Sequence, residues 1–401
     1  MVTTVTPYFS PHNRTSVGQG YDGVVRITVA GNYGTGVLLY DGFAVLTVAH
    51  LFSQASEIAN IRFETTAGIQ TLEMSSVTIH PNYDSVNGNN DLALVWLASS
   101  APKQAIRHEL YRDNNEIGQS FTMVGYGAVG SGTSGTIPTS NGDPLRLKSD
   151  NQFDIDPTTL KTSLGNGMAW TPTAGTQLAA DFDDGTHAHD AFGQLINTSG
   201  LGLGFSEGLI APGDSGGPAF IGNKIAGIAN YTASLSKETI DPDIDNESNS
   251  SFGEIAAWQR VSTYQQWVDQ SLRAKYPNAP IKPEDVQKEI VEGNSGTSLA
   301  YFLVSLVGTR SDPDAFVSVD YASRDGTATA GQDYLAVSGT LKLYPNEDYA
   351  AIPVEIIGDT TPEGNETFYL DVTNPVGGSF GEGIVKLTAV RTILADDGWI
   401  A

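Results

Sequence analysis

The sequence consists of short apolar runs separated by turn-forming residues, and this pattern restricts the fold more than any other feature. Residues 24–29 (VVRITV) alternate as a half-buried strand does. Two further runs, residues 36–40 and 43–47, flank Asp41-Gly42, and an Asp-Gly pair between apolar runs is a strong hairpin signal. Because long helical patterns are few and 44 of the 401 residues are glycine, we expect an all-β chain with about two domains.

The chain is strongly acidic, with 46 Asp and Glu against 21 Lys and Arg and a formal net charge of −25. Such a charge repels phosphate backbones and anionic lipids, so we expect no nucleic-acid partner. No window has the length of a transmembrane helix, so we expect no membrane insertion. The excess carboxylates could be partly neutralised by calcium or could serve solubility alone, and composition does not separate these alternatives.

The sequence contains no cysteine, so no disulfide or thiol chemistry is available and redox chemistry leaves the compartment open. The first residues lack the charged start and apolar core of a signal peptide. We expect an extracellular protein whose signal peptide is absent from this chain. The sequence does not indicate an oligomeric state.

A glycine-rich hexapeptide, residues 213–218 (GDSGGP), encloses Ser215. A serine hydroxyl is a weak nucleophile until an imidazole takes its proton, and a carboxylate must hold that imidazole in the right tautomer. His50 ends one apolar run (TVAH) and Asp91 opens another (DLALV). The flanking glycines let amides converge, so the N–H groups of Gly213 and Ser215 are candidates for an oxyanion hole. Alone, the hexapeptide could be a simple turn and Asp91 a turn cap, but the three motifs together favour a catalytic triad.

The chain order His50, Asp91, Ser215, with these local sequences, resembles the trypsin-like (chymotrypsin-fold) serine proteases. That resemblance implies a double six-stranded β-barrel that hydrolyses peptide bonds in a protein or peptide substrate. It also implies a C-terminal helix, for which residues 263–272 have the amphipathic pattern. The absence of cysteine departs from the disulfide-bonded animal members and suggests a protease of bacterial type.

The same resemblance suggests the residues that set specificity. Leu209, six residues before the nucleophile, would lie at the bottom of the primary pocket, where a trypsin has Asp. Asn230, Tyr231 and Thr232 would form the pocket wall and backbone clamp, and Ala256 would narrow the far side. We therefore expect small to medium apolar side chains at the cleavage site rather than Arg or Lys.

Activation is a further implication of the resemblance, because Asp214 would pair with a new apolar N-terminus released by cleavage. Residues 14–18 (RTSVG) lie near the expected position but lack the usual sequence, which is Ile or Val followed by Val-Gly-Gly. Residues 1–23 are polar and look irregular, so we predict an N-terminal extension or propeptide. Either cleavage near residue 14 frees an activating amine, or activation works in another way. If residues 1–14 remain attached, we expect another partner for Asp214 and a malformed oxyanion hole.

An acidic stretch, residues 181–190, contains four carboxylates and two imidazoles within ten positions. Asp181, Asp183 and Asp184 are candidate calcium ligands because calcium prefers oxygen donors. The spacing does not match an EF-hand loop, so a solvated acidic turn is the alternative.

A second domain follows a linker. Residues 276–283 contain three prolines and are typical of a semi-rigid spacer. Beyond them, short alternating runs recur at the spacing of an immunoglobulin-like β-sandwich, at residues 300–307, 315–319, 339–343, 351–357, 366–372 and 383–390. We predict an extension over 1–23, a protease domain over 24–276, a linker over 277–286 and a sandwich over 287–401.

Motifs in the second domain resemble a Calx-β domain, at residues 326–334 (GTATAGQDY), 338–341 (SGTL), 357–368 (IGDTTPEGNETF) and 393–397 (ILADD). In calcium-binding members, acidic residues at one end of the sandwich share ions. The matching positions here are Glu292, Asp333, Asp359, Glu363, Asp396 and Asp397. Such carboxylates would repel one another unless a cation bridged them, so Ca²⁺ is the expected cofactor. A purely structural cluster is the alternative, since some Calx-β domains lack the sites.

The favoured hypothesis is a secreted serine endopeptidase with a Calx-β module for calcium binding or tethering. The alternative from a different class is a non-catalytic adhesion or matrix protein that uses the protease fold as a scaffold. A zymogen awaiting processing or calcium differs from the first only in regulation. The intact triad and oxyanion glycines argue against a scaffold, which needs neither.

Overall fold

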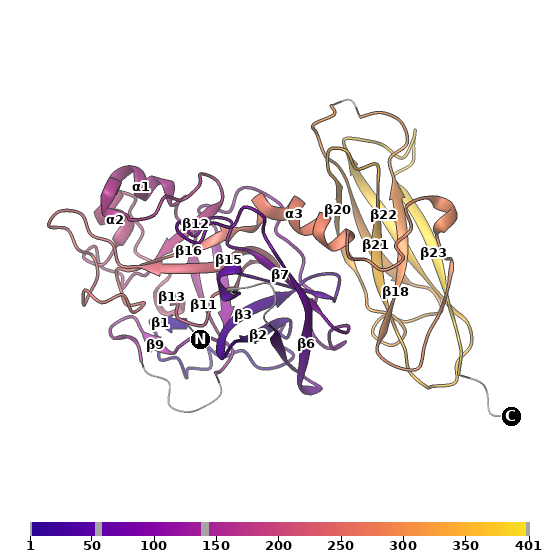
Figure 1. Cartoon of the computed structure of the whole chain (residues 1–401), viewed down its shortest axis with the longest axis horizontal. Coiled ribbons are helices and arrows are strands. Elements are labelled where there is room, and N and C mark those ends of the chain that lie inside the picture. The colour runs from indigo at the N-terminus through magenta and orange to yellow at the C-terminus, as the bar shows by residue number, and fades with distance from the viewer. Residues whose placement is uncertain (1, 53–57, 138–143, 311, 398–401) are drawn as a thin grey trace. The chain divides into compact units, whose positions relative to one another are not determined.

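A computed structural model describes residues 2–52, 58–137, 144–310 and 312–397, and most of its regular structure is β-strand (Figure 1). The chain separates into two compact units, one formed by residues 1–39 and 43–265 and the other by residues 40–42 and 266–401. In the part of the chain described, no helix combines the length and apolar character needed to cross a membrane. The predicted all-β class is confirmed, whereas the domain boundaries stay a prediction.

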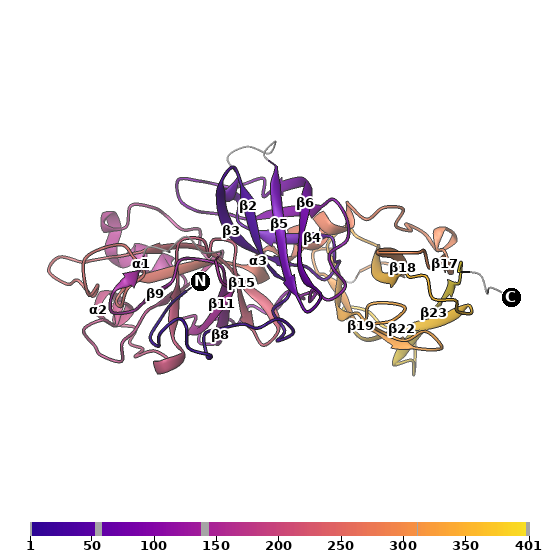
Figure 2. The same ribbon diagram turned by 90° about the horizontal axis from the view of Figure 1, so that it is seen from below.

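The first unit contains a closed barrel with strand order β2-β3-β4-β7-β6-β5. Its strands are β2 (Val24–Val29), β3 (Asn32–Leu38), β4 (Ala44–Thr47), β5 (Ala59–Thr65), β6 (Gly68–Ile79) and β7 (Ala93–Leu97). Figure 2 shows β2, β3, β4, β5 and β6 of this barrel. The alternation expected for β2 places Val25, Ile27 and Val29 in the barrel core. The predicted hairpin joins β3 to β4, with Leu38 opposite Val45.

A second sheet of the first unit has the order β11-β8-β14-β15-β16-β12. Its strands are β8 (Ser120–Gly125), β11 (Leu147–Gln152), β12 (Gln177–Asp181), β14 (Pro218–Ile221), β15 (Lys224–Ala233) and β16 (Ile255–Arg260). Phe121 stacks on Phe153 with ring centroids 3.9 Å apart, and both rings meet Trp258 in the core. A bridge from Ile155 to Ala179 joins the segment after β11 to β12, which brings the two ends of the sheet together and confirms the double-barrel fold.

The N-terminal residues form a strand, so the irregular path predicted for residues 1–23 is wrong for β1 (Val2–Thr4). β1 pairs with β13 (Gly208–Ile210) and with β9 (Gly130–Ser131), which in turn pairs with β10 (Gly135–Thr136). The Thr3 hydroxyl donates to the Leu209 carbonyl at 3.2 Å across 206 positions of sequence. Short strands whose partner is so distant leave no local signal, and this is why the prediction failed.

Helices are few, as expected. α1 spans Thr158–Leu164, α2 spans Ala191–Ile196, and α3 spans Val261–Arg273, where the amphipathic pattern predicted a helix. The described residues also form four 3₁₀ turns, which are η1 (Ala49–Leu51), η2 (Gly165–Gly167), η3 (Gly204–Ser206) and η4 (Pro283–Asp285). Asp190 caps α2 by accepting the Gly193 N–H at 2.7 Å.

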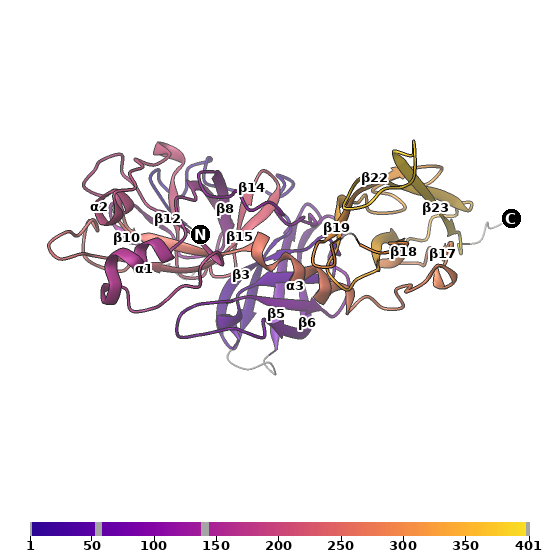
Figure 3. The same cartoon turned by 90° about the horizontal axis from the view of Figure 1, so that it is seen from above.

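The second unit contains a β-sandwich of the predicted kind (Figure 3). One sheet has the order β17-β23-β22-β19-β20, and β18 pairs with β21 in the other. The strands are β17 (Glu289–Val291), β18 (Thr297–Ser305), β19 (Val317–Asp325), β20 (Ser338–Leu343), β21 (Tyr349–Ile357), β22 (Glu366–Val376) and β23 (Lys386–Leu394). Phe368 stacks on Tyr334 in the core at 4.6 Å. Only the short β17 was missed, since three residues cannot display a period.

Candidate active site

Asp91 and His50 form a close pair. Asp91 precedes β7 and is 2% exposed, while His50 lies in η1 just after β4, the second strand of the β3–β4 hairpin. The Asp91 Oδ2 atom is 2.6 Å from His50 Nδ1, and Asp91 Oδ1 accepts the His50 backbone N–H at 2.9 Å. Because a carboxylate only accepts, this geometry assigns the ring hydrogen to Nδ1 and leaves the Nε2 lone pair free.

The loop that carries Asp91 is fastened to the second sheet by buried amides. The Gly88 carbonyl accepts hydrogen bonds from three side chains: Gln177 Nε2 at 3.0 Å, Asn230 Nδ2 at 2.9 Å and Gln259 Nε2 at 2.7 Å. The Tyr264 hydroxyl donates to Asn90 Oδ1 at 3.0 Å. Neither glutamine was predicted from the sequence, because a polar residue inside a strand is their only signal.

The Ser215 loop docks on the strands that lead to His50. The Thr35 N–H donates to the Ser215 carbonyl at 2.9 Å, and the Thr47 hydroxyl donates to the Thr35 carbonyl at 2.7 Å. Gly216 has φ +84°, and a Cβ atom there would lie 2.0 Å from Thr47 Oγ1. The glycine after Ser215 is therefore required both by its backbone conformation and by this close approach.

Ser215 and Leu51, the residue after His50, both lie close to the backbone of Gly34. A Cβ atom added to Gly34 would lie 2.6 Å from the Leu51 side chain and 3.0 Å from the Ser215 carbonyl oxygen. Among the described residues, the Ser215 hydroxyl has no hydrogen-bond partner, so the His50–Ser215 contact of a triad is not formed in this conformation. Such contacts often tighten only when a substrate binds.

The two amides predicted for an oxyanion hole are open donors. Gly213 has φ +97°, and its carbonyl accepts the Thr35 hydroxyl at 2.9 Å. Within the described part of the chain, neither the Gly213 N–H nor the Ser215 N–H donates to a protein acceptor. Both amides therefore remain able to donate to an oxyanion, as an oxyanion hole requires.

Asp214 is buried beneath this loop. Its carboxylate accepts the Gly127 N–H at 2.7 Å and the Ala211 N–H at 2.9 Å, and burial raises its pKa to about 6. Arg14, near the predicted cleavage position, forms an isolated antiparallel β-bridge with Leu147 through its backbone. The segment proposed for activation is thus held in the fold, and the role of Asp214 in activation stays a prediction.

The residues predicted for the substrate pocket are largely covered in this conformation. Leu209 and Ala256 have no exposed area and belong to the core of the second sheet. Thr232 of β15 is paired with Ala256 of β16. The Tyr231 hydroxyl accepts Trp170 Nε1 at 2.8 Å and donates to Gln177 Oε1 at 3.0 Å, which fixes the ring. Leu209 is thus uncharged and buried, and its place at the base of a substrate pocket stays a prediction.

The acidic stretch 181–190 is partly brought together. Asp181 and Asp183 converge with Asp190, and the carboxylate oxygens of the three lie within 4.8 Å of one another. Asp184 turns elsewhere: its carboxylate accepts the Thr186 N–H at 2.8 Å and lies 2.7 Å from His189 Nδ1. The third member of the group is therefore Asp190 and not the predicted Asp184. Asp190 is the N-cap of α2, and the fold places the start of this helix next to the end of β12.

The second unit has two groups of carboxylates, Glu292 with Asp396 and Asp397, and Asp333 with Glu363 and Glu366. Burial, followed by the charges of Asp359, Glu363, Asp397 and Asp396, raises the pKa of Glu292 to about 7. Five of the six predicted positions thus fall in these groups, and Asp359 contributes charge beside them. Glu366, at the start of β22, was not predicted.

The closed barrel and the second six-stranded sheet form the double-barrel fold typical of trypsin-like proteases. This fold carries the Asp91–His50 pair and the glycine-bounded Ser215. A family model described as Trypsin matches residues 13–153, which include His50 and Asp91 but end before Ser215. A family model described as the Calx-beta domain matches residues 287–397. The chain therefore carries a trypsin-like domain and a Calx-beta domain.

Relatives of known identity match the Calx-beta region. The sodium/calcium exchanger Calx of Drosophila melanogaster is 36% identical over 91 residues, which are 22% of this chain and 9% of that protein. Human sodium/calcium exchanger 2 is 36% identical over 92 residues, 20% of this chain and 10% of that protein. The chain thus spans about a tenth of the length of these relatives.

Among solved structures, one similar chain is mouse neuropsin, a serine protease expressed in the limbic system of the brain. It is 16% identical, the match covers 65% of this chain and 98% of that one, and the TM-score is 0.46.

Proposed function

We propose that the protein is a serine endopeptidase. The observation that carries the proposal is the double contact of buried Asp91 with His50, through the ring at 2.6 Å and the backbone at 2.9 Å. A scaffold needs no such pair, because a buried carboxylate that fixes one imidazole tautomer contributes to proton transfer rather than to core packing. The exposure of the His50 side chain, 35%, leaves the ring accessible to a substrate.

In the proposed reaction the Ser215 oxygen attacks the peptide carbonyl while its proton passes to His50 Nε2. The carbonyl oxygen becomes an oxyanion that accepts the N–H groups of Gly213 and Ser215. The imidazolium, stabilised by Asp91, then protonates the departing amine, and an acyl-enzyme remains. Water, deprotonated by His50, attacks the acyl-enzyme in the same way and releases the second product.

We propose a preference for apolar side chains at the cleavage site. The supporting observation is that Leu209 presents no charge at the base of the predicted pocket, so a bound Arg or Lys would lose hydration without gaining a counter-ion. Tyr231, fixed by two hydrogen bonds, would form a rigid wall. Comparing peptides that differ only in an apolar or basic residue at that position would test the preference.

We further propose that the Calx-beta domain binds calcium. The two groups of close carboxylates support this, since oxygen ligands on separate segments repel one another without a cation. The module would then make the rigidity of the second unit depend on calcium.

Fluorophosphonate labelling tests the catalytic proposal. We expect covalent modification of the full chain that disappears in Ser215→Ala. Ser206→Ala is a matched control, because its hydroxyl lies on η3 outside the triad. If neither the intact chain nor any processed form is labelled, with or without calcium, the enzyme assignment is wrong.

A further inference from the structure

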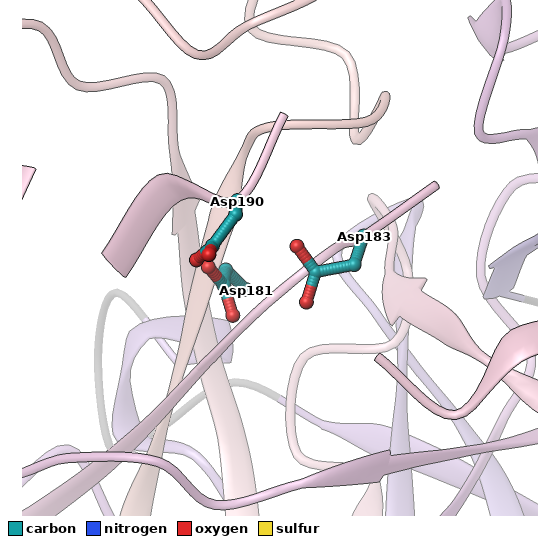
Figure 4. A group of neighbouring side chains, drawn as sticks. All are labelled: Asp181, Asp183 and Asp190. Carbon is teal, nitrogen blue, oxygen red and sulfur yellow. The ribbon is translucent and has the colours of Figure 1, made fainter. Parts of the chain in front are cut away.

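Three carboxylates of the first unit form a buried cluster, defined here as Asp181, Asp183 and Asp190. Asp181 ends β12, Asp183 lies two residues beyond it, and Asp190 caps α2. Their exposed fractions are 4%, 4% and 1%. Figure 4 shows the three carboxylates turned toward one another. This cluster is separate from the carboxylate groups of the second unit.

Two members of the cluster are oriented by hydrogen bonds. Asp181 Oδ2 accepts the Phe192 N–H at 2.8 Å. Asp190 accepts the Gly193 N–H at 2.7 Å with one oxygen and the Ser199 hydroxyl at 2.7 Å with the other. These donors hold both carboxylates in place at the start of α2.

Asp183 differs from the other two. Its Oδ1 atom is buried without a hydrogen-bond partner, and among the described residues no donor reaches either carboxylate oxygen. Its backbone N–H donates to Glu207 Oε1 at 2.8 Å, which fixes the residue while its carboxylate faces Asp181 and Asp190 (Figure 4). A buried carboxylate without a donor is costly, so its position calls for a cation or a shared proton.

The surroundings of the cluster add negative rather than positive charge. Within the described chain no Lys or Arg pairs with its three members, and Glu207 lies beside them. Burial, then the charges of Asp181 and Glu207, raises the pKa of Asp183 well above its usual range. Of the described residues, the exposed His187 comes near the cluster, with Nδ1 4.0 Å from Asp190 Oδ2. Donors that are all oxygen favour a hard cation.

We propose that Asp181, Asp183 and Asp190 bind a calcium ion in the trypsin-like domain. Calcium suits the site better than magnesium, because it accepts six to eight oxygens in irregular geometry, whereas magnesium demands a near-ideal octahedron. The cation joins the end of β12 to the start of α2. Glu207 accepts the Asp183 backbone N–H and directly precedes β13. Through this contact the bound cation also stabilises the segment that leads to the Ser215 loop.

Calcium titration by calorimetry tests the proposal on the full chain after treatment with a chelator. The background variant carries Glu292→Gln and Glu363→Gln, one substitution in each carboxylate group of the second unit, to weaken calcium binding there. In this background we expect one calcium per chain, and at least tenfold weaker binding after Asp183→Asn. Asp184→Asn is the matched control, because the Asp184 carboxylate contacts His189 rather than the cluster. The calcium affinity of this variant should equal that of the background variant.

Two outcomes would overturn the proposal: a background variant that binds no calcium, or Asp183→Asn binding as tightly as Asp184→Asn. The first outcome would favour a cluster that shares protons. Hydrogen exchange on the unmodified chain gives a test without substitution. Calcium should slow the exchange of amides in residues 181–207, and unchanged exchange there at saturating calcium would equally refute the site. Neither measurement depends on proteolysis, so the proposed calcium site would stand even if the proposed enzymatic function failed its own test.

Discussion

Replacing Asp91 by Asn should abolish most activity without unfolding the chain. The side-chain oxygen of Asn can still accept the His50 backbone N–H, which Asp91 accepts at 2.9 Å. The amide nitrogen then faces His50 Nδ1, where the carboxylate oxygen now lies at 2.6 Å. Because that nitrogen only donates, Nδ1 must accept, and the ring hydrogen moves to Nε2. His50 can then no longer take the proton of Ser215.

The size of the effect follows from this tautomer change. Loss of the correct tautomer in a Ser-His-Asp triad lowers kcat by about 10⁴-fold. At about 1.4 kcal/mol for each tenfold change, this corresponds to about 5 to 6 kcal/mol of transition-state stabilisation. Since the shape and both hydrogen bonds are kept, the free energy of unfolding should fall by no more than about 1 to 3 kcal/mol.

The assay is kcat/KM on a chromogenic peptide with an apolar residue at the cleavage site, with urea unfolding measured in parallel. Asp84→Asn is a suitable control, because Asp84 lies on the same loop and bonds Asn87 at 2.7 Å without touching His50. If Asp91→Asn keeps more than a tenth of the activity of the Asp84→Asn control, the proposed role of the Asp91–His50 contact is wrong.

Three other substitutions test the structure. Gly216→Ala places a Cβ atom 2.0 Å from Thr47 Oγ1 at φ +84°, and it should lower the free energy of unfolding in urea by about 2 to 5 kcal/mol. Gly222→Ala is the control, because Gly222 has φ +62° and open space around it, and it should lower that free energy much less. Equal losses for the two variants would contradict the close packing of Gly216 against Thr47. Burial lowers the pKa of His108 to about 4, so stability should fall by about 3 kcal/mol as pH drops from 7 to 4, because the unfolded chain takes up a proton that the folded chain excludes. His108→Gln should flatten that pH profile of unfolding, and an unchanged slope would refute the assignment. Glu292→Gln should reduce the rise in unfolding temperature that calcium gives the second unit, and an undiminished rise would exclude Glu292 as a ligand.

Local pattern predicted much of this protein. The alternation of residues 24–29, the Asp-Gly hairpin and the six runs of the sandwich appear as strands where they were expected. These features are local because a strand's period and a turn's backbone requirements are properties of neighbouring residues. The same holds for the setting of His50 at the end of a hairpin.

Contacts between distant segments were decided only by tertiary structure. Asp190 replaced Asp184 in the buried cluster because α2 turns its N-cap back to β12, which no spacing rule encodes. The Gly88 carbonyl accepts hydrogen bonds from side chains on three strands, β12, β15 and β16. Side-chain identity fixes which atoms can donate or accept, but which of them meet depends on sheet order and register, and these are set by burial over the whole domain.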